Sequence, residues 1–398
     1  MIKEKYSIAY NKFITEYKKI HLNPWHNISE KELNEIYDNL IQTMDINDIY
    51  DFKYFMNYII KRLSGLNDAH TKMDMVSPIN MSFRIFNDTV IVNYPLDLKG
   101  YHLLSINDIN IEQIIKEIDE IITYGTKGKR RIEIEKSLFN KCILFGLPSL
   151  RNSNELVFKL ESQNKKEITK TFSKNENNES FNYNEYLYGN ITSYEIKDDI
   201  LLYKLSSLQN EFKDIFSTIE ELNNVDLSKI KTIIIDIRGN TGGNSSLSIP
   251  AIEFLKKHKD KKLICLTDYR VFSAGRILLI DLKRLGALTI GEEISTPINS
   301  YGNSHWININ NNYSFSISEC YFNPIKNIGI HDKKNFTKQI EEDSNNLIFY
   351  KPDIQAEETL EDYLNNIDTI LNRVIKETKQ WKIGVQWKIG VLLQITIN

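Results

Sequence analysis

Apolar residues recur at helical spacing through the first part of the chain, up to about residue 65. Ser29 and Glu32 have the spacing of a capping box, and the apolar positions after them lie three or four residues apart. A second stripe of the same spacing runs from Phe52 to Leu63. Aromatic and aliphatic residues at this spacing are usually packed in a core. The pattern therefore predicts a helical N-terminal domain over residues 1–75.

The apolar period shortens to two residues after about residue 80. β-Branched residues alternate with polar ones in 83–94 and 100–111, and both stretches are broken by Asn-Asp pairs that favour turns. Helical spacing returns at 111–122 and 134–144. A polar, Asn-rich stretch at 173–190 has the composition of a loop or domain boundary. We therefore predict a strand-rich segment over residues 76–190.

Continuous apolar runs, typical of strands buried on both faces, alternate with helical segments in the second half of the chain. The strands expected from these runs are 201–208, 231–238, 263–267 and 287–291. Helices are expected at 246–258 and 274–285, and Gly286 has the position of a helix-ending glycine. This alternation predicts right-handed crossovers and a largely parallel sheet. Residues 191–378 are therefore predicted to form an α/β domain, closed by one amphipathic helix that carries Leu360 to Val374.

The C-terminal segment, residues 379–398, contains a short duplication. Gln-Trp-Lys-Ile-Gly-Val at 380–385 is repeated at 386–391. One hexapeptide copied once is too short for a repeat fold. A tandem duplication in the gene and a pair of strands are the two interpretations, and we assign the segment no function.

Composition and charge exclude several classes of protein. The chain has 398 residues, with 50 Lys+Arg against 53 Asp+Glu, so its formal net charge of -3 offers no bulk attraction to nucleic acid or anionic lipid. The N-terminus mixes charged and apolar residues, unlike a signal peptide, and no apolar run is long enough to span a membrane. The three cysteines lack metal-site spacing and are expected to be reduced thiols. A cytoplasmic protein without nucleic-acid or membrane partners fits these features.

The first candidate for chemistry is a glycine-rich stretch directly after a predicted buried strand. It reads Asp-Ile-Arg-Gly-Asn-Thr-Gly-Gly over 236–243, with glycines at Gly239, Gly242 and Gly243. Glycines at this density let the backbone turn sharply and expose N–H groups, as an anion or oxyanion site requires. The stretch is neither a phosphate loop nor a dinucleotide fingerprint. An ordinary strand-to-helix turn is the alternative interpretation.

Two further polar segments contain a serine and a histidine. Ser273, in Val-Phe-Ser-Ala-Gly over 271–275, precedes a predicted helix and is either its N-cap or a nucleophile at the positive end of the helix dipole. Val271 replaces the first glycine of a nucleophile elbow. His70 lies in Leu-Asn-Asp-Ala-His-Thr over 66–71. A surface or hydrogen-bonded core histidine is the alternative for His70.

Taken together, these segments and their order resemble the tail-specific (C-terminal processing) serine peptidases. The family's typical segments are L-x-D-x-H-T, D-x-R-x-N-x-G-G, S-A-x-E, G-E-x-T-x-G and P-D, and the likeness extends loosely over residues 60–375. The stretch Gly-Tyr-His-Leu-Leu-Ser-Ile-Asn-Asp at 100–108 is similar to the degenerate PDZ-like element of the tricorn-type branch. The implied architecture is α/β: a helical N-terminal domain, a small strand-rich PDZ-like segment, and a crotonase- or ClpP-like β/α catalytic core with a C-terminal helix.

The resemblance also implies roles for individual residues. Ser273 would be the nucleophile, and the oxyanion hole would use the N–H of Ala274 with an N–H of Gly239, Gly242 or Gly243. One branch of the family uses a lysine base about 25 residues after the serine, but this chain has no lysine between Lys283 and Lys326.

His70 is therefore the expected general base, as in the branch that includes tricorn and interphotoreceptor retinoid-binding protein. The acid that orients it stays open among Glu319, Asp332 and Glu293.

The implied function is that of a serine endopeptidase acting on unstructured polypeptides or peptide ends through an acyl-enzyme, with no metal and no organic cofactor. Two alternatives stay open: a catalytically silent peptide- or ligand-binding protein on the same fold, and another acyl-transfer or crotonase-type enzyme. The presence of both Ser273 and His70 favours catalysis, because a binding protein needs no such pair. The expected partner is a peptide or unfolded protein, and assembly into a homo-oligomer stays open.

Overall fold

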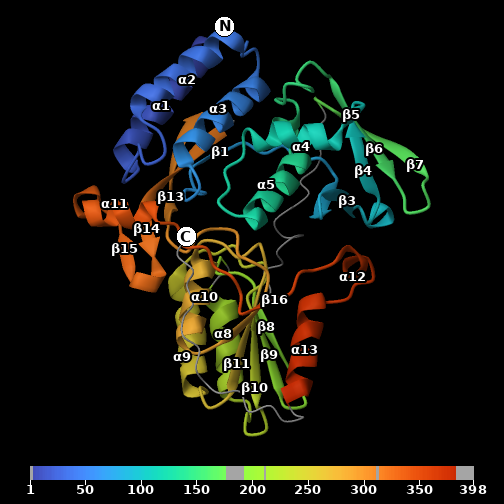
Figure 1. The fold of residues 1–398 in the computed structure, drawn as a ribbon, viewed down its shortest axis with the longest axis vertical. Coiled ribbons are helices and arrows are strands. Elements are labelled where there is room, and N and C mark those ends of the chain that lie inside the picture. The colour runs from blue at the N-terminus through green and yellow to red at the C-terminus, as the bar shows by residue number, and fades with distance from the viewer. Residues whose placement is uncertain (1–2, 176–191, 210–211, 311–312, 382–398) are drawn as a thin grey trace. The chain divides into compact units, whose positions relative to one another are not determined.

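The structure is a computed structural model that describes residues 3–175, 192–209, 212–310 and 313–381. The chain divides into two compact units (Figure 1). The first unit comprises Met1–Leu187 and Ser295–Leu347, and the second comprises Tyr188–Ile294 and Ile348–Asn398. The predicted segment 191–378 is thus interrupted, because residues 295–347 cluster with the first unit. The fold is α/β, with an N-terminal helical region and several sheets.

The first unit begins with the three helices that the apolar stripes predicted: α1 (Glu4–Ile20), α2 (Glu30–Thr43) and α3 (Ile49–Ser64). The capping box is confirmed, because the Glu32 N–H donates to Ser29 Oγ at 3.2 Å and the Ser29 N–H donates to Glu32 Oε2 at 2.7 Å. Their buried faces share one core with Phe315 and Ile317, which come from a strand far along the chain.

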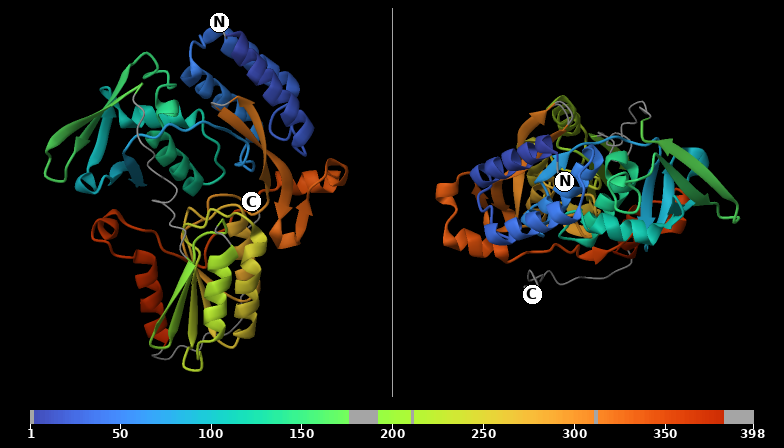
Figure 2. Two further views of the ribbon diagram at one scale, coloured as in Figure 1. Left: turned by 180° about the vertical axis from the view of Figure 1, so that it is seen from behind. Right: turned by 90° about the horizontal axis from the view of Figure 1, so that it is seen from above.

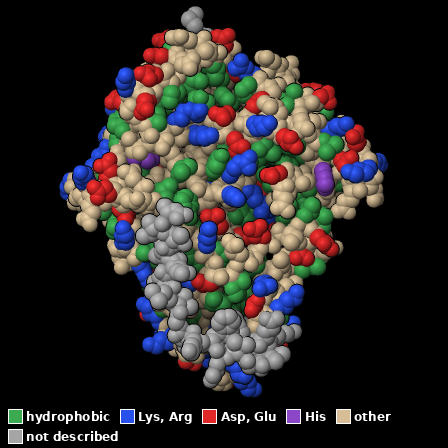
Figure 3. Space-filling model, viewed as in Figure 1, with side chains coloured by type: hydrophobic (Ala, Val, Ile, Leu, Met, Phe, Trp, Pro, Cys, Tyr) green, Lys and Arg blue, Asp and Glu red, His purple; other side chains and the backbone are tan. Residues whose placement is uncertain are grey.

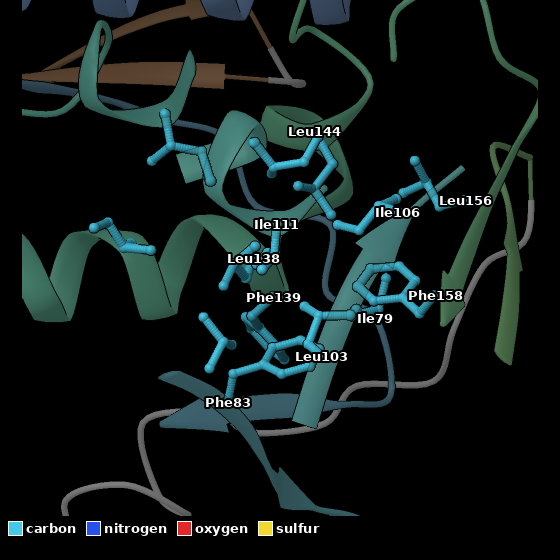
Figure 4. Close-up of a cluster of buried hydrophobic side chains, with 14 of the residues drawn as sticks. Ile79, Phe83, Leu103, Ile106, Ile111, Leu138, Phe139, Leu144, Leu156 and Phe158 are labelled. Carbon is cyan, nitrogen blue, oxygen red and sulfur yellow. The ribbon is translucent and has the colours of Figure 1, made fainter. Parts of the chain in front are cut away.

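A six-stranded antiparallel sheet follows in the first unit, with strand order β2-β3-β4-β6-β7 and β5 paired with β4. Its strands are β2 (Ser82–Phe86), β3 (Thr89–Tyr94), β4 (His102–Ile106), β5 (Ile109–Asn110), β6 (Glu155–Glu161) and β7 (Glu167–Ser173). The accompanying helices are α4 (Ile111–Asp119), α5 (Lys127–Phe139) and α6 (Lys141–Leu144). Figure 4 shows strand residues such as Phe83, Leu103 and Phe158 packed with Leu138 and Phe139 of α5.

The predicted Asn-Asp turns are confirmed. Asn87 and Asp88 have φ of 45° and 67°, and Asn107 and Asp108 have φ of 49° and 63°. Two successive residues with positive φ make the tight turn that matches the twist of a hairpin. The strands β6 and β7 were not predicted, because their charged residues hide the alternation of apolar side chains.

A second sheet of the first unit joins segments far apart in sequence. It contains β1 (Lys72–Asp74), β13 (Ser300–Asn310), β14 (Tyr313–Asn323) and β15 (Ile328–Ile330), with β14 between its neighbours. Helix α11 (Lys338–Asn345) follows. All pairings in this sheet are antiparallel, and the long β13–β14 hairpin was not predicted from the sequence.

The second unit contains the predicted parallel sheet. Its strand order is β16-β12-β11-β10-β9-β8, and every pair is parallel except β8 with β9. The strands are β8 (Thr192–Lys197), β9 (Ile200–Leu205), β10 (Thr232–Asp236), β11 (Lys262–Thr267), β12 (Leu288–Gly291) and β16 (Ile354–Gln355). The helices are α8 (Phe212–Asn223), α9 (Ile249–Lys257), α10 (Ala274–Arg284), α12 (Leu360–Leu364) and α13 (Thr369–Trp381). Figures 1 and 2 show α13 on one face of this sheet and α8, α9 and α10 on the other.

The expected single helix over Leu360 to Val374 is wrong, because the chain forms α12 and α13 with a break between them. Asn366 adopts a left-handed φ of 54° at the break, which ends a helix. The Asp368 carboxylate accepts the Leu371 N–H at 2.9 Å and so caps the next one. The duplicated hexapeptide lies almost wholly outside the described residues.

The visible surface carries mixed charges, and the three cysteines lie in the interior. Figure 3 shows Lys and Arg side chains interspersed with Asp and Glu over the visible face. Cys142, Cys265 and Cys320 are buried, and none forms a disulfide. Within the described part of the chain, no helix combines the length and apolar character needed to cross a membrane.

Candidate active site

The glycine turn, residues 239–243, directly follows β10 and is organised by Asn240. This side chain is fully buried; its Oδ1 accepts the Gly242 N–H at 2.9 Å and its Nδ2 donates to the Leu205 carbonyl at 2.8 Å. Gly239 and Gly242 have φ of 78° and 92°, conformations that favour glycine. The turn is therefore a fixed structure and not merely a flexible connection.

The Ser273 turn, residues 271–275, joins β11 to α10 in an unusual backbone conformation. Ser273 has φ of 52° and ψ of -122°, which side-chain-bearing residues rarely adopt. Although Ser273 holds the N-cap position of α10, its side chain makes no cap hydrogen bond. The common structural role of an N-cap serine therefore does not explain this residue.

The glycine turn and the Ser273 turn touch each other through their backbones. A β-carbon built on Gly242 would lie 2.6 Å from the Ala274 nitrogen and 2.8 Å from Ser273 Cβ. The Phe272 N–H donates to the Asn240 carbonyl at 2.9 Å. A β-carbon on Gly275 would meet that same Asn240 oxygen at 2.5 Å. Only glycine fits at both positions, so the two turns form one compact unit around Ser273.

The N–H groups of these turns differ in whether they can bind a ligand. The Gly239 N–H donates to Asp268 Oδ1 at 2.9 Å and the Gly242 N–H is taken by Asn240, so neither can serve an oxyanion in this conformation. Among the described residues, the N–H groups of Ala274 and Gly243 have no hydrogen-bond partner. Ala274 opens α10, where the helix dipole adds positive potential. The predicted set of donors thus narrows to Ala274 and Gly243.

Buried ion pairs on either side of the glycine turn in sequence help to fix its backbone. Asp268 is almost fully buried, and its carboxylate binds Arg270 at 2.6 Å as well as the Gly239 N–H. Burial alone would raise the pKa of Asp268, but Arg270 and the Gly239 N–H lower it below its ordinary value.

Arg238 forms forked hydrogen bonds to Asp236 and to Asp368, with Nη2–Oδ2 distances of 2.7 Å to each. Such planar pairing fixes direction as well as distance.

The His70 segment, residues 66–71, belongs to the first unit and connects α3 to β1. Asp68 Oδ1 accepts the N–H groups of His70 at 3.2 Å and Thr71 at 3.0 Å. The His70 carbonyl accepts a hydrogen bond from Ser316 Oγ at 2.6 Å. The half-buried His70 ring lies beside Gly302, where an added β-carbon would come 3.5 Å from ring atom Cε1. Its backbone is therefore held on both sides.

Comparison with known proteins gives a result for structure alone. No protein-family model matches the chain, and no curated protein matches it. Mature CPAF has 9% sequence identity and a TM-score of 0.59, over 94% of this chain and 98% of that chain. Mature CPAF complexed with lactacystin has 10% identity and a TM-score of 0.57, over 90% and 94%. The chain shares its fold with mature CPAF. The photosystem II D1 C-terminal processing protease, at 9% identity over 89% and 94%, has a TM-score of only 0.43.

Within this CPAF fold, the three acids expected near His70 have different surroundings. Glu319 lies on β14 between Ser318 and Cys320, so its side chain points to the opposite face from Ser316 and Ser318. It accepts a hydrogen bond from Asn303 at 2.6 Å and lies 3.2 Å from His305. The role of Glu319 as the acid that orients His70 stays a prediction.

The other two acids differ again. Asp332 caps a short turn by accepting the Lys334 N–H at 3.0 Å, and its role as the acid that orients His70 stays a prediction. Glu293 belongs to the second unit, and its role stays a prediction.

Four contributors to these sites were missed from the sequence. Asn240 and Asp268 position the glycine turn, Asp68 holds the His70 backbone, and His21 contacts Asp68 from the end of α1. Asn240 and Asp68 stood inside the motifs, and an assignment of each polar motif residue to a backbone partner could have found them. His21 carried no signal, because it lies 47 residues before Asp68 in the chain. The described residues contain no group of three or more His, Cys, Asp or Glu side chains suited to a metal ion.

Proposed function

We propose that the protein is a serine-type peptidase of the tail-specific kind, with Ser273 as nucleophile and His70 as general base. The observation that carries the proposal is the strained backbone of Ser273, with φ of 52°, packed against the glycine turn. Strain of this kind costs about 1–3 kcal/mol and persists where function requires the geometry. The CPAF fold supports the proposal, and the motif resemblance supplies the class of reaction.

The reaction follows from the groups on these two segments. Ser273 Oγ would attack the carbonyl carbon of a peptide bond as its proton passes to a His70 ring nitrogen. The negative oxygen that forms would be stabilised by the N–H groups of Ala274 and Gly243. His70 would then give the proton to the leaving amine, which departs and leaves Ser273 acylated. A water molecule, deprotonated by His70, would hydrolyse the ester and restore the serine.

The substrate class proposed is an unstructured polypeptide or peptide end, and it rests on the family resemblance. A peptide bond must reach the Ser273 backbone closely enough for two N–H groups to bind its oxygen. An extended, unfolded segment meets this need with little reorganisation, whereas a folded domain would have to open first. The two branches of the family differ in the general base, which is a lysine in one and a histidine in the other. The proposed role of His70 therefore favours the histidine branch.

A fluorophosphonate probe tests the proposal, because it reacts with an activated serine and forms a stable ester. We expect labelling of the wild type, none in Ser273→Ala, and a reduction of at least 10²-fold in His70→Ala, the usual upper contribution of a general base being about 10⁴-fold. Ser246→Ala is the matched control, since Ser246 is exposed just beyond the glycine turn and its hydroxyl donates to Asn244 Oδ1. Labelling that survives in Ser273→Ala would refute the assignment. Absence of labelling in a wild type that binds peptide would favour a binding protein.

A further inference from the structure

Asp68 is a buried carboxylate without a lysine or arginine partner among the described residues. It has no exposed surface. Its Oδ1 accepts three hydrogen bonds, from Ser318 Oγ at 2.5 Å and from the two N–H groups of the His70 segment. Its Oδ2 lies 3.3 Å from His21 Nε2. Burial would raise the pKa of Asp68, but His21, Ser318 and Thr71 together hold it well below its ordinary value.

The contacts of His21 assign its tautomer. The Asn23 N–H donates to His21 Nδ1 at 3.2 Å, so Nδ1 is an acceptor and the ring proton lies on Nε2, facing Asp68. The ring is fully buried and lies between aromatic neighbours, with centroid distances of 5.0 Å to Tyr17 and 4.6 Å to Tyr301. In this tautomer the Nε2–H of His21 faces Asp68 Oδ2 at 3.3 Å, an electrostatic contact that falls outside hydrogen-bond geometry.

The other end of this network is the backbone of the proposed base. Two residues of β14 act with Asp68: Ser316 Oγ donates to the His70 carbonyl, and the Ser318 N–H donates to Thr71 Oγ1 at 3.1 Å. Ser316 and Ser318 share one face of the strand, so both point at the His70 segment. The His70 N–H donates to Asp68 Oδ1, so Asp68 contacts the backbone of the proposed base directly.

We propose that Asp68, held by His21 and Ser318, is the positioning residue for His70. It acts on the backbone of His70 and Thr71, and so it is distinct from an acid that would bind the His70 ring. This inference rests on the proposed function of His70 as general base. A displacement of about 1 Å at a reacting group can cost on the order of 10²-fold in rate, which sets the size of the expected effect.

The test uses two substitutions that differ in hydrogen bonding with little change in shape. Asp68→Asn keeps an acceptor toward the backbone but points an amide donor at the His21 donor, so the two conflict. His21→Gln combined with Asp68→Asn replaces that conflict by an acceptor opposite the new donor. Asp48→Asn is the matched control, because Asp48 is the N-cap of α3 in the same unit and lies outside the His70 segment.

With the fluorophosphonate probe, we expect the maximal labelling rate of Asp68→Asn to fall about 100-fold while half-saturation changes less than about threefold. The double variant should recover at least tenfold, and Asp48→Asn should stay within about twofold of the wild type. Full labelling of a folded Asp68→Asn, or a double variant no faster than the single one, would overturn the proposal.

Hydrogen exchange of the peptide spanning residues 66–71 separates this inference from the proposed function. Protection of these amides should fall in Asp68→Asn, return in the double variant and be unchanged in Asp48→Asn. If the wild type is not labelled but exchange follows this pattern, the proposed activity fails while the positioning of His70 stands. Unchanged protection in a folded Asp68→Asn refutes the positioning whatever the labelling shows.

Discussion

Gly242 and Ala274 approach each other so closely that a β-carbon on Gly242 would lie 2.6 Å from the Ala274 nitrogen. Among the residues that the structure describes, the N–H of Ala274 is one of two donors in these turns that have no hydrogen-bond partner. The absence of a side chain at Gly242 therefore keeps that donor accessible, and it also allows the φ of 92°.

Gly242→Ala should consequently impair both chemistry and folding. The new methyl group must displace the Ser273 turn, and the loss of one oxyanion donor typically costs about 10²–10³-fold in turnover. We expect labelling by fluorophosphonate to fall by at least 10²-fold, and the free energy of unfolding to fall by about 1–3 kcal/mol. Gly286→Ala is a useful comparison, because its φ is also positive but no atom lies within 4 Å of its added carbon. It should lose stability from strain and retain labelling.

Ser273→Gly should be more stable than Ser273→Ala. Both substitutions remove the hydroxyl, but only glycine adopts the φ of 52° without steric cost. We expect a difference of about 1 kcal/mol in the free energy of unfolding, measured by urea titration. Equal stability of the two variants would show that the backbone at Ser273 carries no strain.

Arg238 should be important for the second unit through its two carboxylate partners. Its pKa lies well above its ordinary value, because burial is outweighed by the charges and hydrogen bonds of Asp236 and Asp368. Arg238→Ala leaves Asp236 buried without its partner and should cost about 3–5 kcal/mol of unfolding free energy. Arg373→Ala, which breaks a partly exposed pair with Glu377 on α13, should cost at most about 1 kcal/mol of unfolding free energy. Similar losses in the two variants would contradict this account.

His26 should make the first unit less stable in mild acid. Burial and the neighbouring His21 lower the pKa of His26 from 6.5 to about 4. As pH falls from 6.5 toward 4, the unfolded chain therefore gains a proton that the folded chain does not, and the free energy of unfolding decreases. We expect a loss of about 1–3 kcal/mol across this window, with a flatter pH dependence in His26→Gln. Urea titrations at pH 7 and pH 5 measure it, and an unchanged slope in His26→Gln would count against the prediction.

Asp68 should add a second loss of stability at lower pH. Its pKa is lowered on folding, so its contribution is present above the unfolded value of about 3.9 and is lost as pH falls below it. We expect Asp68→Asn to lack this loss of unfolding free energy below about pH 3.9. The free energies of the wild type and the variant are each compared with their own value at pH 7. If the variant shows an equal decrease in unfolding free energy at low pH, the decrease is due to other carboxyl groups.

The sequence predicted elements where a local pattern determined them. The parallel sheet could be predicted because β10 and β11 are continuous apolar runs, and the turns because Asn-Asp pairs favour positive φ. The β13–β14 hairpin could not be predicted, since its polar residues face a partner more than 200 residues away: Ser316 and Ser318 bind the His70 segment. For the same reason the motifs indicated Ser273 and His70 but not the buried residues that position them.

The distance along the chain between His70 and Ser316, 246 residues, has a consequence for the order in which the protein can mature. During synthesis the helices α1 to α3 and the first antiparallel sheet leave the ribosome long before β14, which completes the first helical core and clamps the His70 backbone. At about 5–20 residues per second, the interval is on the order of 10–50 s. The glycine turn and Ser273 are made within it. A nascent chain that already carries the proposed nucleophile therefore still lacks an ordered candidate base, and the proposed peptidase activity must await the hairpin.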